Sequence, residues 1–520
     1  MKVIIVGGVA GGATAAARIR RLNEHAEITV FERSGYISYA NCGLPYYIGD
    51  VITDPEELTL QTPESFFKRF RINMKIHHEV ISIHPECKTV SVKNLENGEI
   101  FEENYDKLIL SPGGGFIGLE LAENLMELGM DVTIVQRPKQ LMNPFDPDMA
   151  SMIHNEMRKH GIKLVLGYTV EGFKEKDNGV EVLLKDNPSL QADMVVLAIG
   201  VTPDTVLAKE AGLELGIKES IVVNDRMETS VPDIYAAGDA VQVKHYVTGN
   251  DALISLAGPA NKQGRIIADN ICGGGSRYLG SQGSSVIKVF DMTAATTGIN
   301  ETNAKKSGLE VDTVILSPMS HAGYYPGGKV MTMKVVFEKE SYRLLGAQII
   351  GYEGVDKRID VLATAIHAGL NATQLKDLDL AYAPPYSSAK DPVNMAGFMI
   401  DNIAKGTLKH WHLEDMDKLS KDKDVVLLDV RTVGEFSRGH IDGFKNIPVD
   451  ELRERISEIE KGKPVYLICQ SGLRSYIASR ILEGNGYETY NFSGGFRFYD
   501  AVVNDRALIE RAYACGMELI

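Results

Sequence analysis

Apolar runs broken by glycine turns begin the chain and predict a nucleotide-binding unit. Residues 2–6 are an apolar run that ends in glycines, residues 13–22 predict an alanine-rich helix, and residues 28–31 are a second apolar run. In such a strand–turn–helix–strand unit the glycines let the backbone approach a pyrophosphate, and an acid after the second strand accepts the ribose hydroxyls. The residues predicted to bind the dinucleotide are Gly7, Gly8, Gly11, Gly12 and Glu32.

A second glycine cluster predicts a second dinucleotide site, as expected if one nucleotide is a flavin and the other a nicotinamide. The cluster precedes a predicted helix that runs to residue 128 and an apolar run at 132–135. Gln136 and Arg137 follow this run in place of an acid, so NADH and NADPH both stay open, because an arginine can accept a 2′-phosphate. The candidate residues are Gly113, Gly115, Gly118 and Arg137.

Two later apolar segments, 195–200 and 234–240, predict strands that end in turns. The second places Gly238 and Asp239 at a strand end, where a carboxylate suits the ribityl or pyrophosphate region of a flavin dinucleotide. From residue 284 to about 406 the segments alternate in polarity, which predicts an antiparallel sheet with helices.

A different pattern begins near residue 425 and ends in a cysteine loop. An apolar strand at 465–468 leads to Cys469 in a short loop that opens a helix. Such a loop directs backbone N–H groups at the sulfur, and the helix N-terminus with Arg474 adds positive potential. The pattern therefore predicts a thiolate at Cys469.

Composition limits the class of protein. A chain of 520 residues predicts three or four domains, and the net charge of −15 argues against nucleic-acid binding. Five scattered cysteines do not form a disulfide framework, and neither a signal peptide nor a bilayer-spanning apolar run is apparent, so a cytoplasmic protein away from the membrane is expected. No metal site is expected, because the cysteines are scattered and the His77–His78 pair has no partner at ligand spacing.

Cys42 is a lone thiol beside the first nucleotide unit. The nearest other cysteine is Cys87, so a paired-cysteine redox motif is absent. A lone thiol needs an outside partner to form a disulfide, which favours a thiol cofactor or a persulfide as that partner.

These motifs together resemble the pyridine-nucleotide–disulfide oxidoreductases, in the coenzyme A-disulfide reductase and NADH oxidase branch that carries a C-terminal rhodanese domain. The resemblance rests on residues 38–47, 234–240, 382–388 and 429–475. It implies an α/β protein with two Rossmann-like nucleotide-binding domains, an α+β dimerisation domain and an α/β rhodanese domain. The implied segments are 1–112 and 201–283 for FAD, 113–200 for NAD(P)H, 284–406 for dimerisation, 407–415 for a linker and 416–520 for rhodanese.

The resemblance also implies roles for individual residues and implies three cofactors: FAD, a nicotinamide (NADH or NADPH) and coenzyme A. Cys42 is the implied redox thiol and Cys469 the implied carrier of a rhodanese persulfide. Tyr382 and Tyr386 are expected to come from the partner subunit of a homodimer. The residues expected along the coenzyme A path are Arg18, Arg21, Ser38 and Asn41.

The sequence departs from the family at residues 112–114. In the family several tens of residues, including the first strand of the nicotinamide domain, separate the end of the first FAD segment from the second glycine cluster, whereas here Gly113 follows Pro112 directly. The second nucleotide domain is therefore expected to be incomplete. A compacted natural variant, a deletion or faulty gene reading, and a fold that survives without reductant binding all stay open.

Three functions follow from this reading. The first is FAD-dependent NAD(P)H reduction of a coenzyme A persulfide, polysulfide or disulfide through Cys42, with Cys469 handling sulfane sulfur. The second is an NADH oxidase or peroxidase that cycles Cys42 through a sulfenic acid. The third is a sulfur carrier in which only the rhodanese domain is active.

Overall fold

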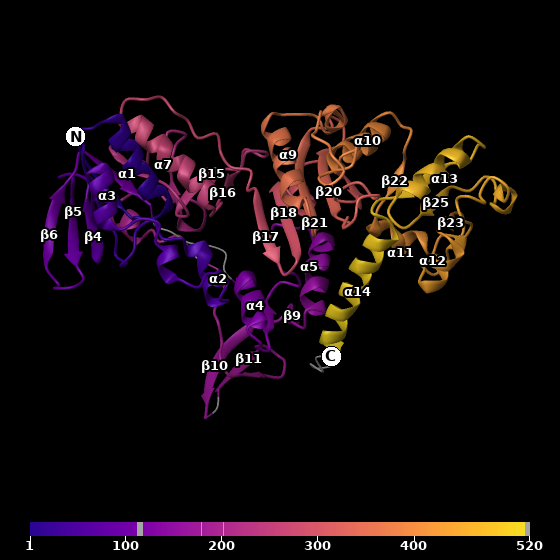
Figure 1. Cartoon of the computed structure of the whole chain (residues 1–520), viewed down its shortest axis with the longest axis horizontal. Helices are drawn as coiled ribbons and strands as arrows, with labels where there is room; N and C mark the ends of the chain where they lie inside the picture. Colours follow the sequence, from indigo (N-terminus) through magenta and orange to yellow (C-terminus); the bar gives the residue numbers. More distant parts are fainter. Residues whose placement is uncertain (112–117, 178, 201, 515–520) are drawn as a thin grey trace. The chain divides into compact units, whose positions relative to one another are not determined.

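The computed structural model describes residues 1–111, 118–177, 179–200 and 202–514 (Figure 1). They divide into two compact units. The first comprises Met1–Met130 and Val196–Gly283, and the second comprises Asp131–Val195 and Ser284–Ile520.

A five-stranded parallel sheet forms the centre of the first unit. Val3, Ile4 and Ile5 of its middle strand have no exposed surface, as expected for a strand covered on both faces. Helices α1 (Ala10–Leu22) and α7 (Ala257–Ile271) pack side by side on this sheet (Figure 1). In sheet order the strands are β14 (Ile234–Ala236), β7 (Lys107–Leu110), β1 (Lys2–Val6), β2 (Glu27–Phe31) and β3 (Asn73–Lys75).

Two small sheets and short helices complete this unit. The antiparallel sheet is β4 (His78–His84), β5 (Thr89–Asn94) and β6 (Ile100–Asn104), and the other is β13 (Ile221–Val222), β15 (Val241–Lys244) and β16 (Asp251–Ala252). The helices are α2 (Leu44–Ile48), α3 (Pro63–Phe70), α4 (Gly118–Glu127) and α6 (Val206–Glu210).

The segment predicted as the second nucleotide domain forms only fragments of a Rossmann sheet. Strand β8 (Thr133–Gln136) pairs in parallel with β9 (Lys163–Leu166), and helix α5 (Pro147–Lys159) lies between them in the chain. A separate antiparallel sheet contains β10 (Val170–Lys176), β11 (Gly179–Leu184) and β12 (Leu190–Ala192). The strand predicted at 195–200 is wrong: residues 194–200 have no regular structure, and Ile199 is 91% exposed. Without the missing first strand this apolar segment has no sheet to join.

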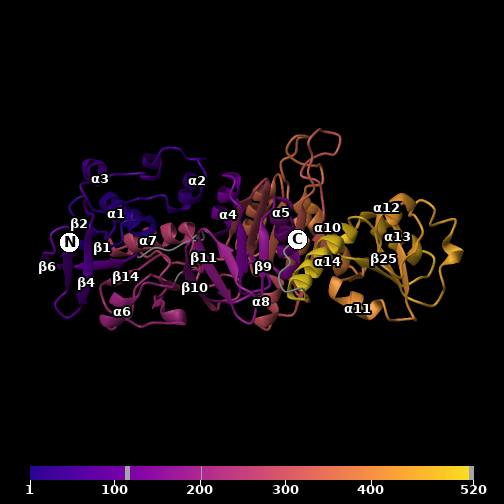
Figure 2. The same ribbon diagram turned by 90° about the horizontal axis from the view of Figure 1, so that it is seen from below.

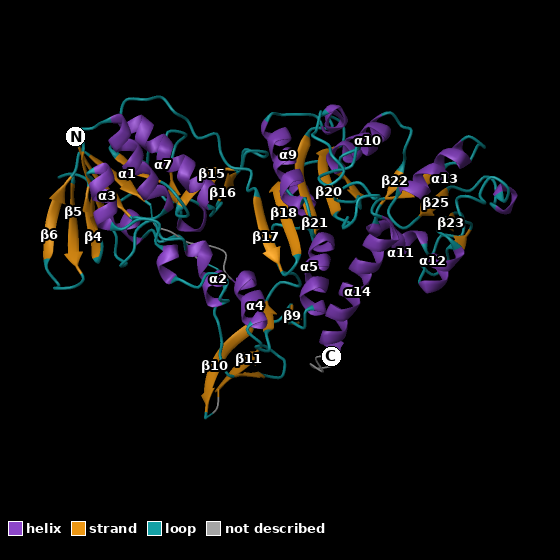
Figure 3. Ribbon diagram, viewed as in Figure 1, coloured by secondary structure: helices purple, strands orange, loops and turns teal. Residues whose placement is uncertain are grey.

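The predicted antiparallel domain is confirmed as a five-stranded sheet with helices (Figure 3). In sheet order its strands are β17 (Ser285–Val289), β18 (Met292–Gly298), β21 (Leu344–Gly351), β20 (Thr332–Glu338) and β19 (Val311–Leu316). Its helices are α8 (Glu301–Lys306), α9 (Val355–His367) and α10 (Pro392–Ala404).

A parallel five-stranded sheet with flanking helices forms the C-terminal part. The sheet order is β22 (His410–Trp411), β26 (Thr489–Phe492), β25 (Val465–Ile468), β23 (Val426–Asp429) and β24 (Lys445–Asn446). Strand β22 lies inside the segment expected to be a linker. The helices are α11 (Met416–Leu419), α12 (Val433–Arg438), α13 (Leu473–Glu483) and α14 (Gly495–Ala514), and α14 packs along α5 (Figure 2). No helix in the described part of the chain has the length and apolarity to cross a membrane.

One buried ion cluster joins three elements of the second unit. The Lys334 side chain on β20 is 2% exposed, and its Nζ lies 2.8 Å from Asp148 Oδ2, 3.2 Å from Asp146 Oδ2 and 2.8 Å from Glu301 Oε2. Burial alone would lower the pKa of Lys334, but the three carboxylates outweigh it and raise that pKa.

Replacing Lys334 by Met is expected to destabilise this unit by about 3–5 kcal/mol, because it leaves buried carboxylates without their cation. The midpoint of urea unfolding, followed by circular dichroism, measures the loss. Lys339→Met, at an exposed lysine beyond the end of β20, is the control and is expected to shift the midpoint little. Equal midpoints for the two variants would contradict the argument.

Candidate functional site

The first glycine turn is built to receive a dinucleotide. A Cβ on Gly12 would lie 2.0 Å from Gly7 O, so only glycine lets α1 start this close to β1. Glu32 ends β2, is buried, and accepts from Gly8 N–H at 2.8 Å and from Ser34 N–H at 2.9 Å. Its oxygens keep lone pairs for ribose hydroxyls. The turn, the helix N-terminus and the acid fit the adenosine and pyrophosphate parts of FAD.

The second part of the flavin domain closes onto the same turn. Gly238 follows β14, and its N–H donates to Gln263 Oε1 on α7 at 2.7 Å. A Cβ on Gly264 of α7 would lie 2.3 Å from Gly11 O, so the two helices touch at their glycines. Asp239 is half-buried beside Gly238 at the end of β14, as the sequence predicts. Gln263 was not predicted, because a glutamine within a helix carries no sequence signal.

The Cys42 loop is anchored to the glycine turn. Ser38 N–H donates to Gly8 O at 2.9 Å, and Ser38 has a positive φ of 45°, which bends the chain away from the turn. Asn41 and Cys42 then lie exposed in a short 3-10 turn, η1 (Asn41–Gly43), before α2. The four cysteines in the described residues are all free. The predicted redox thiol is therefore accessible and unpaired, and its loop is hydrogen-bonded to the flavin turn.

Tyr46 is a further polar residue near this thiol that the sequence did not indicate. Its hydroxyl donates to Glu120 Oε1 on α4 at 3.2 Å. Burial and the Glu120 carboxylate raise the pKa of Tyr46 to about 12, and burial also raises the pKa of Glu120. The phenol therefore stays protonated near neutral pH and links α2 to α4.

The two predicted arginines of the coenzyme A path differ in their surroundings. Arg18 Nε pairs with Asp269 Oδ1 on α7 at 2.8 Å, so this charge is already compensated. Arg21 lies one turn further along α1 and is exposed. Arg21 is therefore the better candidate of the two for an external phosphate.

Only part of the predicted nicotinamide site lies within the described residues. Strand β7, the only strand directly before the second glycine cluster, is held between β1 and β14 in the flavin sheet and cannot begin a second sheet. Gly113 and Gly115 lie outside the described residues. Gly118 begins α4 in the first unit, whereas Arg137 is exposed after β8 in the second unit, where β8 pairs with β9 alone among the described strands.

The two predicted tyrosines lie on a loop that a buried arginine supports. The hydroxyl oxygens of Tyr382 and Tyr324 are 2.6 Å apart, and Tyr386 is 73% exposed. Arg358, 1% exposed, lies 3.0 Å from Asp391 Oδ2 and donates to Tyr386 O. Arg358 and Tyr324 were missed, because neither belongs to a local motif. Both predicted tyrosines are therefore exposed on this loop, and Tyr382 is hydrogen-bonded to Tyr324.

Cys469 lies in a cage of donors at the start of α13. Its side chain is buried, and Sγ accepts from Gly472 N–H at 3.1 Å and from Ser475 Oγ at 3.2 Å. Gly472 has a φ of 102°, which turns its N–H toward the sulfur. The strand, loop and helix predicted around Cys469 are confirmed.

Arg474, which was predicted to add positive potential at the sulfur, forms an ion pair with Glu435. Its two terminal nitrogens lie 2.7 Å from the two oxygens of Glu435, and this pairing lowers the pKa of Glu435 to about 2. A cavity of about 400 Å³ opens beside the loop. It is lined by Arg431, Glu435, Arg438, Gly439, Gln470, Phe496, Arg497 and Asp500.

Comparison with known proteins identifies the family of each domain. The sequence profile described as "Pyridine nucleotide-disulphide oxidoreductase" matches residues 1–114 and 111–264, its dimerisation domain matches 284–392, and a rhodanese-like domain matches 412–501. The two pieces of the first profile meet at the junction where the missing segment was predicted.

Relatives of known structure extend over almost the whole chain. The reduced CoADR-RHD of Bacillus anthracis is 44% identical with a TM-score of 0.94, covering 97% of this chain and 98% of that one. The NAD-dependent persulfide reductase from A. fulgidus is 36% identical with a TM-score of 0.89, covering 96% and 100%.

A curated relative aligns over more positions than this chain has residues in the alignment. The coenzyme A disulfide reductase of Staphylococcus aureus (strain JH9) is 35% identical over 439 residues, which are 76% of this chain and 99% of the relative. The alignment spans 439 positions but includes only about 395 residues of this chain, which is 76% of 520. About 44 positions of the alignment therefore have no residue in this chain. The chain belongs to the pyridine nucleotide-disulphide oxidoreductase family, in the coenzyme A disulfide reductase branch with a C-terminal rhodanese-like domain, and is a flavin-dependent oxidoreductase that acts on sulfur.

Proposed function

We propose that this chain cleaves coenzyme A persulfides, polysulfides or disulfides at Cys42 and handles sulfane sulfur at Cys469, as a cytoplasmic homodimer. The observation that carries the first part is the 2.9 Å hydrogen bond from Ser38 N–H to Gly8 O, which ties the loop of the exposed, single Cys42 to the flavin turn. Two sulfur centres in one chain favour a persulfide over a plain disulfide as substrate. The dimerisation domain and the relatives named above support the dimer and the coenzyme A substrate.

The thiol step needs only Cys42 and the substrate. The Cys42 thiolate attacks the sulfur of the persulfide that is bonded to coenzyme A, the S–S bond breaks, hydrosulfide leaves, and a Cys42–coenzyme A disulfide forms. The two electrons that return this disulfide to the Cys42 thiolate and free coenzyme A would come from reduced FAD held at the first glycine turn. Exposed Arg21 on α1 is suited to bind a coenzyme A phosphate, and Tyr382 and Tyr386 of the partner are suited to position the sulfur.

The rhodanese step transfers a sulfane sulfur without net oxidation or reduction. The Cys469 thiolate takes the outer sulfur of an anionic donor such as thiosulfate, sulfite leaves, and the new persulfide passes that sulfur to an acceptor thiol or cyanide. Gly472 N–H and the Ser475 hydroxyl donate to Cys469 Sγ and would stabilise its thiolate.

A second candidate function is favoured by the position of β7. Because this strand belongs to the flavin sheet, electrons from NAD(P)H have no complete entry site, and the chain would then act in the cell as a sulfur carrier through Cys469. The oxidase alternative has weaker support, because dioxygen reduction would give the rhodanese-like domain no role.

An anaerobic titration followed by flavin absorbance tests both functions. We expect dithionite to bleach the flavin and coenzyme A persulfide to restore it with release of sulfide. We expect NADH and NADPH to bleach it at least about 100-fold more slowly than in a relative with a complete second domain, because cofactor positioning is lost. Failure of coenzyme A persulfide to reoxidise the reduced flavin would contradict the proposed thiol step. Rapid bleaching by NADH or NADPH would exclude the carrier role as the sole function.

A further inference from the structure

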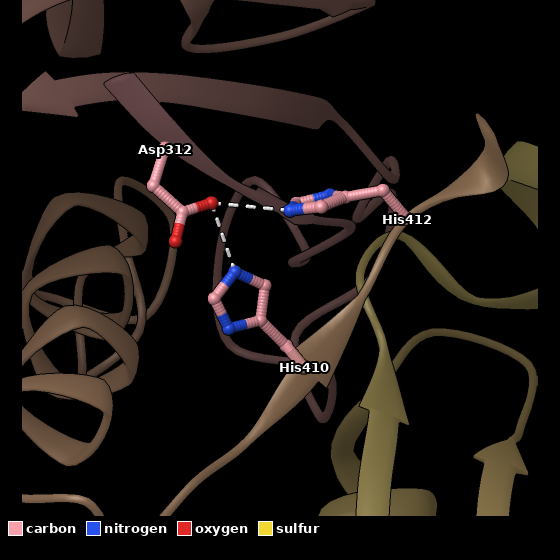
Figure 4. A group of neighbouring side chains, drawn as sticks. All are labelled: Asp312, His410 and His412. Atoms are coloured by element: carbon pink, nitrogen blue, oxygen red, sulfur yellow. Dashed lines mark hydrogen bonds and ion pairs between the residues drawn. The ribbon is translucent and has the colours of Figure 1, made fainter. Parts of the chain in front are cut away.

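Three metal-ligating side chains converge where the rhodanese sheet meets the antiparallel domain. Asp312 is on β19, His410 is on β22, and His412 follows β22 (Figure 4). His410 Nε2 lies 3.0 Å and His412 Nε2 lies 3.1 Å from the same oxygen, Asp312 Oδ1. One ligand atom from each of the three residues lies within 4.8 Å of the others.

The local backbone explains why both rings face one point. Alternate residues of an extended strand project to the same side, so His410 and His412 share a side and Trp411 takes the other. Trp411 is 2% exposed and packs against Phe492 with tilted rings and a centroid distance of 4.4 Å, which fixes the orientation of the strand. Because the Trp411 indole is buried in the rhodanese core, both imidazole rings project to the opposite side, toward Asp312.

The spacing is close to that of a tetrahedral ion site. Ligands about 2.0–2.1 Å from Zn²⁺ lie about 3.3 Å from one another. The observed nitrogen–oxygen distances of 3.0 and 3.1 Å need only a small expansion to reach this value. Two imidazoles and one carboxylate are a common set of protein ligands for zinc.

Burial and charge also suit a cation. The side chains of Asp312, His410 and His412 are 19%, 11% and 28% exposed, which shields the ligands but leaves room for water as a fourth ligand. Within the described residues, the ion pairs of Asp312 are with these two imidazoles alone, and its Oδ1 also accepts from Thr313 N–H at 2.7 Å.

We propose that Asp312, His410 and His412 bind a divalent transition-metal ion of the Zn²⁺ class, which fastens strand β22 of the rhodanese sheet to β19. This proposal differs from the expectation from the sequence that the chain has no metal site. The inference does not depend on the chemistry proposed for Cys42 or Cys469. Each neutral imidazole would coordinate through Nε2 and keep its proton on Nδ1, so the ion replaces two hydrogen bonds to the carboxylate.

The test measures metal binding by the full chain after dialysis against a chelator. We expect Co²⁺ to give the visible bands of a tetrahedral site without thiolate charge-transfer bands, and Zn²⁺ to displace it with a stoichiometry of one per chain. Asp312→Asn, and the double variant His410→Asn with His412→Asn, should each weaken Zn²⁺ binding by at least about 100-fold. His25→Asn, at an exposed histidine of the first unit, should leave it unchanged.

Thermal unfolding gives a second measurement that does not require catalysis. Zn²⁺ should raise the melting temperature of the wild-type chain and not that of Asp312→Asn, because an ion bound to the native state alone stabilises it. The inference is overturned if wild type binds no Co²⁺, or if binding persists in both variants and is lost on replacing Cys42 or Cys469. In that case the three side chains form only a hydrogen-bonded His–Asp–His contact.

Discussion

Replacing Cys42 by serine is expected to abolish persulfide-dependent reoxidation of the reduced flavin, with a loss of at least about 1000-fold in rate. A serine hydroxyl is a far weaker nucleophile than a thiolate and cannot form the mixed disulfide with coenzyme A. Because Cys42 is exposed and its loop is held through the Ser38 backbone, the variant should fold and keep FAD. Stopped-flow absorbance after anaerobic reduction with dithionite measures the rate.

Cys87→Ser is the matched control. Cys87 is also exposed, also belongs to the first unit, and lies in the turn between β4 and β5. Its replacement should leave the rate within about twofold, as is usual for exposed sites outside a reaction centre. A Cys42→Ser protein that still reoxidises its flavin with coenzyme A persulfide would exclude Cys42 as the acceptor thiol.

Replacing Cys469 by alanine is expected to remove sulfur transfer from thiosulfate to cyanide, again by at least about 1000-fold. The sulfur that accepts the persulfide is then absent, while the sheet that holds the loop stays intact. Thiocyanate formation measures the rate. The flavin reaction of the same variant should be unchanged, because Cys469 belongs to the second unit and Cys42 to the first.

Ser475→Ala is expected to cause a smaller loss of sulfur transfer than Cys469→Ala. It removes one of the two donors to Cys469 Sγ and should lower sulfur transfer by about 10-fold to 100-fold, the value of one hydrogen bond to an anion. If Ser475→Ala and the wild type transfer sulfur equally fast, the donor cage around Cys469 does not stabilise the anion.

The first flavin turn and the Cys469 loop could be predicted because each is a local pattern. Gly7 to Glu32 and the strand before Cys469 carry their chemistry within a few tens of residues, and the structure forms both as expected. The mixed α/β architecture with its four kinds of domain followed from the same motifs and their order along the chain.

The features that could not be predicted from the sequence depend on residues that are distant along the chain. The segment 195–200 has the apolar pattern of a strand, yet a strand exists only where another strand pairs with it, and here that neighbour is missing. Arg358 and the contact of Asp312 with His410 join residues far apart in the chain, so no spacing rule finds them. In the sequence, His410 and His412 lie two positions apart on either side of Trp411. Without Asp312 they offer only two ligands to a metal.

Strand β22 also protects the sheet against self-association. It pairs with Asn491 and Phe492 on the outer edge of β26, which would otherwise expose unpaired amides and carbonyls. A rhodanese fragment expressed from Leu413 onward would lack this strand and present an open, aromatic edge to its neighbours. The two residues that look like a linker therefore determine whether the last domain can be produced alone as a monomer.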